Sequence, residues 1–297
     1  MCANTRSELG ESLAKELRKP LTFWRLLFSY GMTAIAFVFT ALALIPLLSI
    51  LAEIIGRGLS KLKPEVLVSL PAPPGLEGVT NGFANAIVGT IITVGIAAIL
   101  SIPCGVMTGI YLAEFGKESR LANIVRFITQ ILTGVPSIVV GVFAYGVIVL
   151  TTKKFSALAG GFALSIIMLP IITLTVEEAL KLIPMSLRLA SAALGGTRLQ
   201  TTFHVVVTAA LPGITTGILL AIARAAGETA PLIFTALFSQ TWSEGLFSPS
   251  ASLSVLIYNN ANSPYPEQNE LAWTASIVLL GLVLFINIAS RLLTRKR

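Results

Sequence analysis

The chain has 297 residues, of which 55% are hydrophobic and only 12% are charged, and its mean hydropathy is +0.85. This composition excludes an ordinary soluble domain and predicts an all-α integral membrane protein. The formal charge of +7 does not indicate a nucleic-acid partner, because the basic residues are scattered in short segments between apolar runs. The single histidine, His204, and two distant cysteines, Cys2 and Cys104, predict neither a metal site nor a disulfide framework.

Six apolar runs follow one another along the chain. The first run follows a basic segment that ends at Arg25, and it is too long for the core of a signal peptide. We expect a short interfacial helix before Pro20 and a Pro/Gly-rich external loop after the first run. The predicted spans are residues 26–55, 83–115, 121–150, 155–175, 211–238 and 271–293.

These runs suggest a division of the chain into two parts. Residues 1–83 hold an amino-terminal tail, the first span and the external loop at 56–82, whereas residues 84–297 hold five spans. Prolines inside the runs permit bends, above all Pro136 in the third run. Residues 176–207 carry several charges and too little continuous hydrophobicity to span, so we expect short helices outside the hydrocarbon there. Residues 239–270 are expected to form a second long external loop.

The distribution of basic residues predicts the orientation in the membrane. Fifteen Lys and Arg residues lie in the amino-terminal tail, the turn after the second run, the 176–207 segment and the carboxyl end, and five lie on the opposite side. Because Lys and Arg concentrate in cytoplasmic loops, both termini and residues 176–207 are predicted to be cytoplasmic.

The fifth run, residues 211–238, contains a charged pair. As a continuous helix it would be about 40 Å long, with Arg224 near the middle of the bilayer and Glu228 one turn further on. Charged residues at that depth are costly and usually mark an ion or substrate path. The alternative is an ion pair that only orients the helices. An adjoining stripe of small residues predicts a close helix contact and consists of Gly213, Gly217, Ala221 and Ala225.

The 176–207 segment resembles a known docking element. The stretch LASAALGGTRLQTTFHVVVTAALPGI resembles the EAA loop of ABC importer permeases, in which two short helices meet at a glycine and dock onto the ATPase. Gly195 matches the motif glycine, and Gly196 follows it. Leu189 stands where the motif usually has glutamate, so the charged residue that contacts the ATPase stays open. The candidates by position are Glu177, Glu178, Arg188 and Arg198.

A second resemblance covers the chain from about residue 84 to its end. The segment ILLAIARAAGETAPLIFTAL, together with YLAEF at 111–115, GVPSIVVG at 134–141 and LIPMSLR at 182–188, is similar to PstA-type permeases of the phosphate-specific ABC importer. The block RAAGETAP favours the PstA type over the sister PstC type. The resemblance implies a type I ABC importer permease fold, with six transmembrane helices and a coupling-helix loop between spans four and five.

The resemblance also implies partners and a location. A PstC-type sister permease, two copies of a cytoplasmic ABC ATPase and an external phosphate-binding protein would assemble with the chain in the bacterial inner membrane. The sequence itself has no G-x-x-x-x-G-K-[ST] motif, so ATP and Mg are expected on the partner ATPase and not in this chain. We therefore expect a non-catalytic transport subunit without a cofactor of its own.

Two other functions are compatible with the residues. The first is an ABC permease for another oxyanion such as sulfate or molybdate, because arginine pairs with any of these anions. The second is a secondary anion transporter that needs no ATPase. Such transporters often contain internal repeats around a midplane site, and we find no such repeat between the two halves of this sequence.

Overall fold

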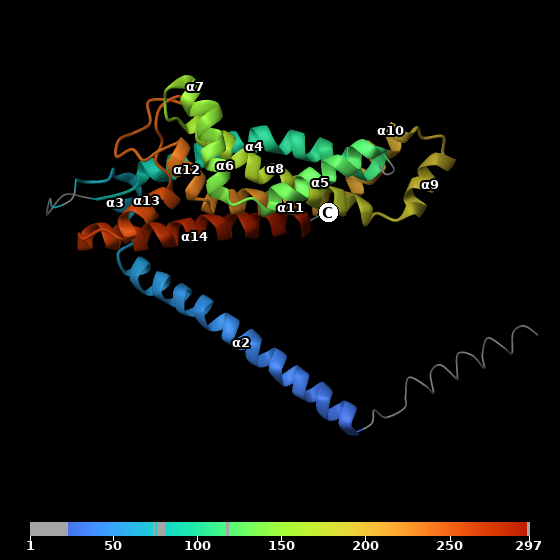
Figure 1. The fold of residues 1–297 in the computed structure, drawn as a ribbon, viewed down its shortest axis with the longest axis horizontal. Coiled ribbons are helices and arrows are strands. Elements are labelled where there is room, and N and C mark those ends of the chain that lie inside the picture. The colour runs from blue at the N-terminus through green and yellow to red at the C-terminus, as the bar shows by residue number, and fades with distance from the viewer. Residues whose placement is uncertain (1–22, 74, 76–80, 117–118, 296–297) are drawn as a thin grey trace, which may run out of the picture. The chain divides into compact units, whose positions relative to one another are not determined.

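All the regular secondary structure in the described part of the chain is helical. The computed structural model describes residues 23–73, 75, 81–116 and 119–295 (Figure 1). Among these residues, five helices are long and apolar enough to cross a membrane, and one bent helix pair makes a sixth crossing if it is counted as one span. The predicted all-α membrane fold with six spans is thus confirmed. The chain divides into two units, residues 1–53 and 54–297.

The first span is the long helix α2 (Phe23–Ser60), which contains the predicted run and extends it at both ends. The part of α2 up to Glu53 belongs to the first unit. The interfacial helix expected before Pro20 lies outside the described residues. The external loop was predicted to begin at residue 56, but α2 continues to Ser60, and the loop contains a short helix, α3 (Pro64–Val68), that begins with a proline in its first turn.

The centre of the second unit is a pair of helices, α4 (Ala84–Ile110) and α8 (Ala157–Lys181). Gly105 of α4 faces Ile172 of α8, where an added Cβ would lie 2.9 Å from the isoleucine Cβ. Helix α4 continues without a break into the π-helix η1 (Tyr111–Phe115). This close approach of two backbones makes α4 and α8 the core around which the other helices pack.

The fourth span is longer than predicted. The sequence suggested an end at Thr175, but α8 continues for six more residues to Lys181. Val176 and Leu180 are fully buried, so the apolar face of the helix persists beneath the charged residues that had suggested a non-spanning segment.

The third apolar run is sharply bent. Helix α5 (Arg120–Gly134) is followed by α6 (Ser137–Ala144) at an angle of 105°. Val135 and Pro136 are extended, because the proline ring disfavours helical geometry in the residue before it. After α6 the chain continues as the π-helix η2 (Tyr145–Val149) and the short helix α7 (Leu150–Thr152).

The connection between the fourth and fifth spans is shorter than the predicted segment 176–207. It contains the nine-residue helix α9 (Met185–Ala193), which leads through a turn to α10 (Arg198–Gln200). From α10 the chain continues through the π-helix η3 (Thr201–Val206) into α11 (Val207–Gly227). Both ends of the predicted segment therefore belong to spans.

The fifth run was predicted as one helix over residues 211–238, and this prediction is wrong. Helix α11 ends at Gly227, Glu228 is extended with φ −73° and ψ 130°, and a new helix, α12 (Ala230–Thr235), follows. Gly227 weakens the helix, and Pro231 in the first turn of α12 favours a new helix start. The run is apolar on both sides of the break, so its hydropathy gives no sign that the helix ends there.

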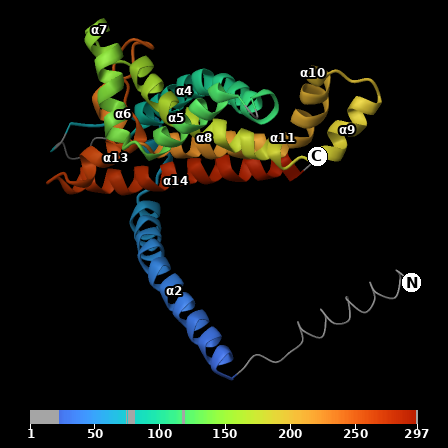
Figure 2. The same cartoon turned by 45° about the vertical axis from the view of Figure 1, so that its right-hand side comes forward.

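The expected loop at 239–270 also contains a helix. Helix α13 (Leu253–Ala261) begins at the N-cap Ser252, whose hydroxyl accepts a hydrogen bond from the Val255 N–H. Its first turn is buried in an apolar cluster with the start of α14 (Pro266–Arg295), which is the sixth span. Figures 1 and 2 show α7 and α13 at one end of the second unit, and α9 and α10 at the other.

The predicted small-residue stripe lies where α11 contacts α8. A Cβ at Gly213 would lie 2.9 Å from the Cβ of Ala179, and a Cβ at Gly217 would lie 2.7 Å from the Cβ of Thr175. Ala221 and Ala225, which continue the stripe, are buried. Only small residues fit here, so the stripe sets the distance between the two helices.

Replacing Gly217 with leucine is expected to force α11 away from α8. Overpacking of this kind costs about 2 kcal/mol and should lower the apparent thermal midpoint of the detergent-solubilised protein by about 5 °C. The control is Gly281→Leu on α14, because no atom outside its own backbone lies within 4 Å of that Cβ position. Equal midpoints for the two variants would show that the close contact is dispensable.

Candidate functional site

The charged pair of the fifth run lies at the helix break. Arg224 is in the last turn of α11, and Glu228 is the first residue after it. The Arg224 Nε and a Glu228 carboxylate oxygen are 3.7 Å apart, so the predicted pairing of these residues occurs. The side chain of Arg224 is 57% exposed, whereas that of Glu228 is only 18% exposed. The pair is therefore asymmetric, because the carboxylate is mostly buried and the guanidinium is mostly exposed.

Backbone contacts explain why Glu228 is fixed. Its N–H donates to the Ala225 carbonyl at 3.2 Å, and its carbonyl accepts a hydrogen bond from the Ser254 hydroxyl at 2.9 Å. Ser254 lies in the first turn of α13, so this helix between the fifth and sixth spans anchors the break in the fifth span. Arg224 has no comparable restraint, since its guanidinium makes no hydrogen bond to any described residue.

Arg224 and Glu228 line an open groove of about 570 Å³. The other walls come from α13 and α14, through residues such as Ile257, Ser276 and Leu280. Apolar side chains dominate these walls, so the guanidinium is the main cationic group on the groove. An arginine beside a mostly apolar wall attracts anions more strongly than one in bulk water, because the local dielectric constant is lower.

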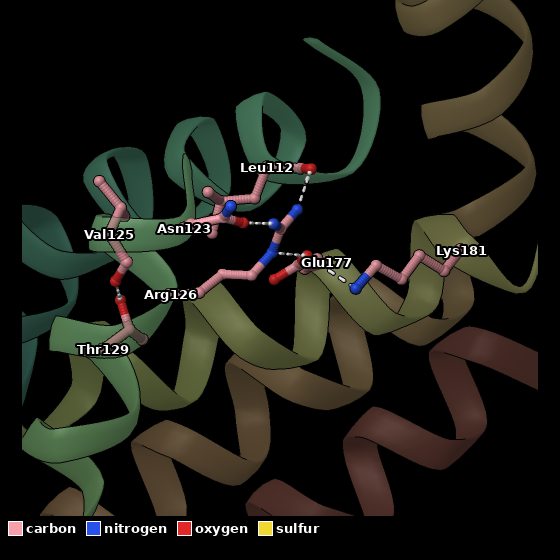
Figure 3. Close-up of polar contacts among 7 residues, drawn as sticks. All are labelled: Leu112, Asn123, Val125, Arg126, Thr129, Glu177 and Lys181. Atoms are coloured by element: carbon pink, nitrogen blue, oxygen red, sulfur yellow. Dashed lines mark hydrogen bonds and ion pairs between the residues drawn. The ribbon is translucent and has the colours of Figure 1, made fainter. Parts of the chain in front are cut away.

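A second charged cluster lies at the opposite end of the unit and joins α5 to α8 (Figure 3). Arg126 Nε donates to a carboxylate oxygen of Glu177 at 2.6 Å, and Lys181 Nζ approaches the same oxygen at 2.7 Å. Arg126 also donates to the Leu112 carbonyl of η1 and to the side chain of Asn123. The side chain of Glu177 is only 3% exposed, so its carboxylate is buried, and both cations contact the same one of its oxygens.

A third cluster holds the segment between α8 and α11. Arg188 forms two hydrogen bonds to the carboxylate of Glu114, at 2.6 and 3.4 Å, and donates to the carbonyls of Leu180 and Ile183 at the end of α8. Arg198 donates to the backbone carbonyl of Glu114. The residues enclose a cavity of about 340 Å³ between η1 and α9.

These contacts bear on the residues predicted to contact an ATPase. Arg188 and Arg198 both donate hydrogen bonds to η1, and Glu177 is buried in the second cluster, so none of the three is a free surface charge. Glu178 is exposed on α8. Reasoning from the sequence missed the roles of Glu114 and Arg126, although charges within or beside apolar runs are the available signal for such pairs.

The glycine of the turn has the geometry that its motif position suggests. Gly195 has a φ of +84°, which favours glycine strongly over other residues. The Gly195 N–H donates to the Ala192 carbonyl and the Gly196 N–H to the Ser191 carbonyl, both at 3.0 Å. This is a Schellman C-cap, which ends α9 and reverses the chain toward α10.

Several apolar side chains in and next to α9, which leads into this turn, are exposed on the surface of the chain. The strongly exposed ones in and next to α9 are Leu182, Met185, Leu189 and Leu194. A cluster of this kind outside the spans is typical of a surface that binds another protein.

The buried pair of the second cluster makes a stability prediction. Arg126→Met leaves the buried Glu177 carboxylate with Lys181 alone and should cost about 3 kcal/mol of apparent stability. Lys181→Met should cost less than about 1 kcal/mol, because the lysine side chain is 54% exposed. Arg126→Met/Glu177→Met should recover most of the loss in a thermal unfolding assay. If Lys181→Met proves as damaging as Arg126→Met, the lysine holds the carboxylate instead.

Comparison with known proteins agrees with this architecture. Residues 105–297 match a family described as binding-protein-dependent transport system inner membrane component. An alginate ABC transporter chain superposes with a TM-score of 0.62 at 15% identity, over 92% of this chain and 98% of that one. A chain of the MetNI methionine ABC transporter superposes with a TM-score of 0.56 at 21% identity, over 72% and 93%. Both likenesses concern the fold alone.

Relatives identified by sequence define the family more narrowly than the fold does. The phosphate transport system permease protein PstA of Yersinia pestis is 42% identical over 251 residues, which is 84% of each chain. PstA of Haemophilus influenzae is 39% identical over 270 residues, or 91% of this chain and 95% of the relative. A probable PstA of Methanocaldococcus jannaschii is 35% identical over 254 residues, or 85% and 88%. The chain therefore belongs to the PstA family of phosphate transport system permease proteins.

Proposed function

We propose that this chain is the permease subunit that forms, with a sister permease, the path of inorganic phosphate through an ATP-driven importer. The observation that carries the proposal is the state of Arg224. Its guanidinium lies on a groove of about 570 Å³ and has one ion-pair contact at 3.7 Å, with no hydrogen bond to a described residue. A guanidinium with free donors suits a passing oxyanion, because its planar fork matches two phosphate oxygens.

Glu228 has a moderating part in this proposal. Its carboxylate is close enough to Arg224 to weaken anion binding by competition, and its backbone is fixed by Ser254. Transport requires binding that is strong enough for entry and weak enough for release. A carboxylate 3.7 Å from the arginine serves this requirement. Phosphate has to displace the Glu228 carboxylate from Arg224 in order to bind, and the carboxylate displaces phosphate again when the anion leaves.

The energy source lies outside the chain in this proposal. The sequence has no motif that cradles ATP, so ATP and Mg belong on a cytoplasmic ATPase, two copies of which would bind the permease pair. We place the ATPase contact at the turn around Gly195 and Gly196 and at the exposed apolar side chains of α9. Glu178, which is exposed nearby, remains a candidate for a polar contact.

The remaining partner delivers the cargo. An external phosphate-binding protein is supported by the description of the matched family, which refers to binding-protein-dependent transport. Phosphate as the cargo is supported by the names of the PstA relatives. We place the whole assembly in the bacterial inner membrane, with residues 84–297 as the permease core and residues 1–83 as the amino-terminal tail, the first span and an external loop.

The rival functions have distinct signatures. A permease for sulfate or molybdate would give ATP-driven uptake of that anion in place of phosphate in liposomes that contain the chain and its partners. A secondary anion transporter would continue uptake after ATP depletion while an ion gradient is intact.

Arg224→Gln should abolish uptake without loss of the complex. We expect phosphate uptake per assembled complex to fall by about a factor of ten or more, because charge-assisted hydrogen bonds to the anion are lost. Arg224→Lys should retain part of the activity, since it keeps the charge but loses the fork. Glu228→Gln should impair uptake less than Arg224→Gln does. The assay is uptake of labelled phosphate in proteoliposomes, normalised to complex that still hydrolyses ATP, and normal uptake by Arg224→Gln would refute the assignment.

Gly195→Val should weaken association with the ATPase. A β-branched residue at a φ of +84° is strained by about 1–2 kcal/mol, so the end of α9 should rearrange. Gly195→Asn is the matched control, because asparagine tolerates this geometry and the space around the Cβ position is empty. Co-purification of the ATPase should fall for the valine variant and stay near normal for asparagine. Equal recovery for both would place the ATPase contact elsewhere.

The proposed orientation follows from the basic residues and places the α9–α10 turn in the cytoplasm. In a chain whose native cysteines are replaced by serine, Leu194→Cys should react with a membrane-impermeant maleimide only after the cells are opened. Asn262→Cys, which follows α13, should react in intact cells. Labelling of residue 194 in intact cells would show that the chain has the opposite orientation in the membrane.

A further inference from the structure

Both sides of the α9–α10 turn contact one residue in η1. Arg188, on α9 before the turn, binds the carboxylate of Glu114, and Arg198, after the turn, binds its backbone carbonyl. The guanidinium of Arg198 also lies 5.0 Å from the ring centroid of the neighbouring Phe115. Two cationic side chains that are separated by the flexible glycines of the turn therefore converge on the end of α4.

Arg188 and Glu114 form a two-point ion pair between largely buried side chains. The guanidinium uses Nη2 and Nε for the two carboxylate oxygens, at 2.6 and 3.4 Å, and both side chains are largely buried. A bidentate pair with little solvent fixes direction as well as distance. The carbonyls of Leu180 and Ile183 occupy further donors of Arg188, so the arginine holds the end of α8 and the end of η1 together.

The π-helical geometry of η1 is part of this arrangement. The Gly116 N–H donates to the Tyr111 carbonyl at 2.7 Å, five residues back, which widens the last turn of the helix. The carbonyls of Leu112 and Glu114 accept hydrogen bonds from Arg126 and Arg198. The end of α4 is therefore bound by side chains from α5 and from the α9–α10 turn, which satisfy carbonyls at its last turn.

We infer that Glu114 is the joint through which movement of the α9–α10 turn is passed to α4, and hence that it is a positioning residue for coupling. The turn is joined to α8 and to η3, its neighbours in the chain, by the backbone and by side-chain contacts such as those of Arg188 with Leu180 and of Ser191 with Thr201. Glu114 adds a side-chain connection to α4, which is distant in sequence and belongs to the core pair of the unit. This inference rests on the proposed function, because it assumes that an ATPase moves the turn.

The test is the number of phosphates transported per ATP hydrolysed. The complete complex, with sister permease, ATPase and phosphate-binding protein, is reconstituted in liposomes with Glu114→Gln or Arg188→Lys. For Glu114→Gln we expect ATP hydrolysis per complex to stay near the wild-type rate while phosphate transported per ATP falls about tenfold. Arg188→Lys should shift the ratio in the same direction by a smaller factor, since it keeps the charge but loses the bidentate contact.

The matched control is Glu270→Gln, which breaks an exposed ion pair with Lys61 away from the turn and should leave the ratio unchanged. An unchanged ratio in Glu114→Gln would overturn the inference. Loss of assembled complex in both test variants would also overturn it, because the pair would then serve folding. If the wild-type complex showed no ATP-driven phosphate uptake, the proposed function itself would fail, so the two failures are distinguishable.

Discussion

The arrangement of the second unit depends on pairing buried carboxylates with arginines near one end of the helices. Glu177 and Glu114 are both buried, and each is bound at 2.6 Å by an arginine from another helix. An unpaired carboxylate in such surroundings would cost several kcal/mol, so each arginine is required by its partner. The same guanidinium groups cap the carbonyls at the ends of α8 and η1. Loss of one pair would therefore leave both a charge and a helix end unsatisfied.

The contrast with Arg224 gives this arrangement its functional meaning. Arg126 and Arg188 have carboxylate and carbonyl partners within hydrogen-bond distance, whereas Arg224 has only a carboxylate at 3.7 Å and is more than half exposed. Arg126 and Arg188 thus use their hydrogen-bond donors within the fold, whereas the guanidinium of Arg224 makes no hydrogen bond to a described residue. The helix break after Gly227 is the physical reason, because it frees the backbone of Glu228 to bond with α13 and opens a groove beside the guanidinium.

Much of this structure could be predicted from the sequence, and the failures have physical causes. Hydropathy located the spans, and the match of Gly195 to the glycine of the EAA motif predicted a turn between short helices, where its φ is +84°. Hydropathy does not report backbone geometry, so the break at Glu228 and the helix α13, whose first turn is buried, were missed. The pairs of Glu177 with Arg126 and Glu114 with Arg188 join residues that are 51 and 74 positions apart, and no local pattern predicts such contacts.

The central claim is that Arg224 meets the transported anion and is not merely a structural partner of Glu228. The most direct measurement is phosphate uptake per assembled complex in the double variant Arg224→Gln/Glu228→Gln, which removes both charges and leaves neither one unpaired. If the pair served only structure, removing both members would restore a working transporter. The account predicts complexes that assemble and hydrolyse ATP but take up less than about a tenth of the wild-type phosphate. Uptake at the wild-type rate per complex would contradict it.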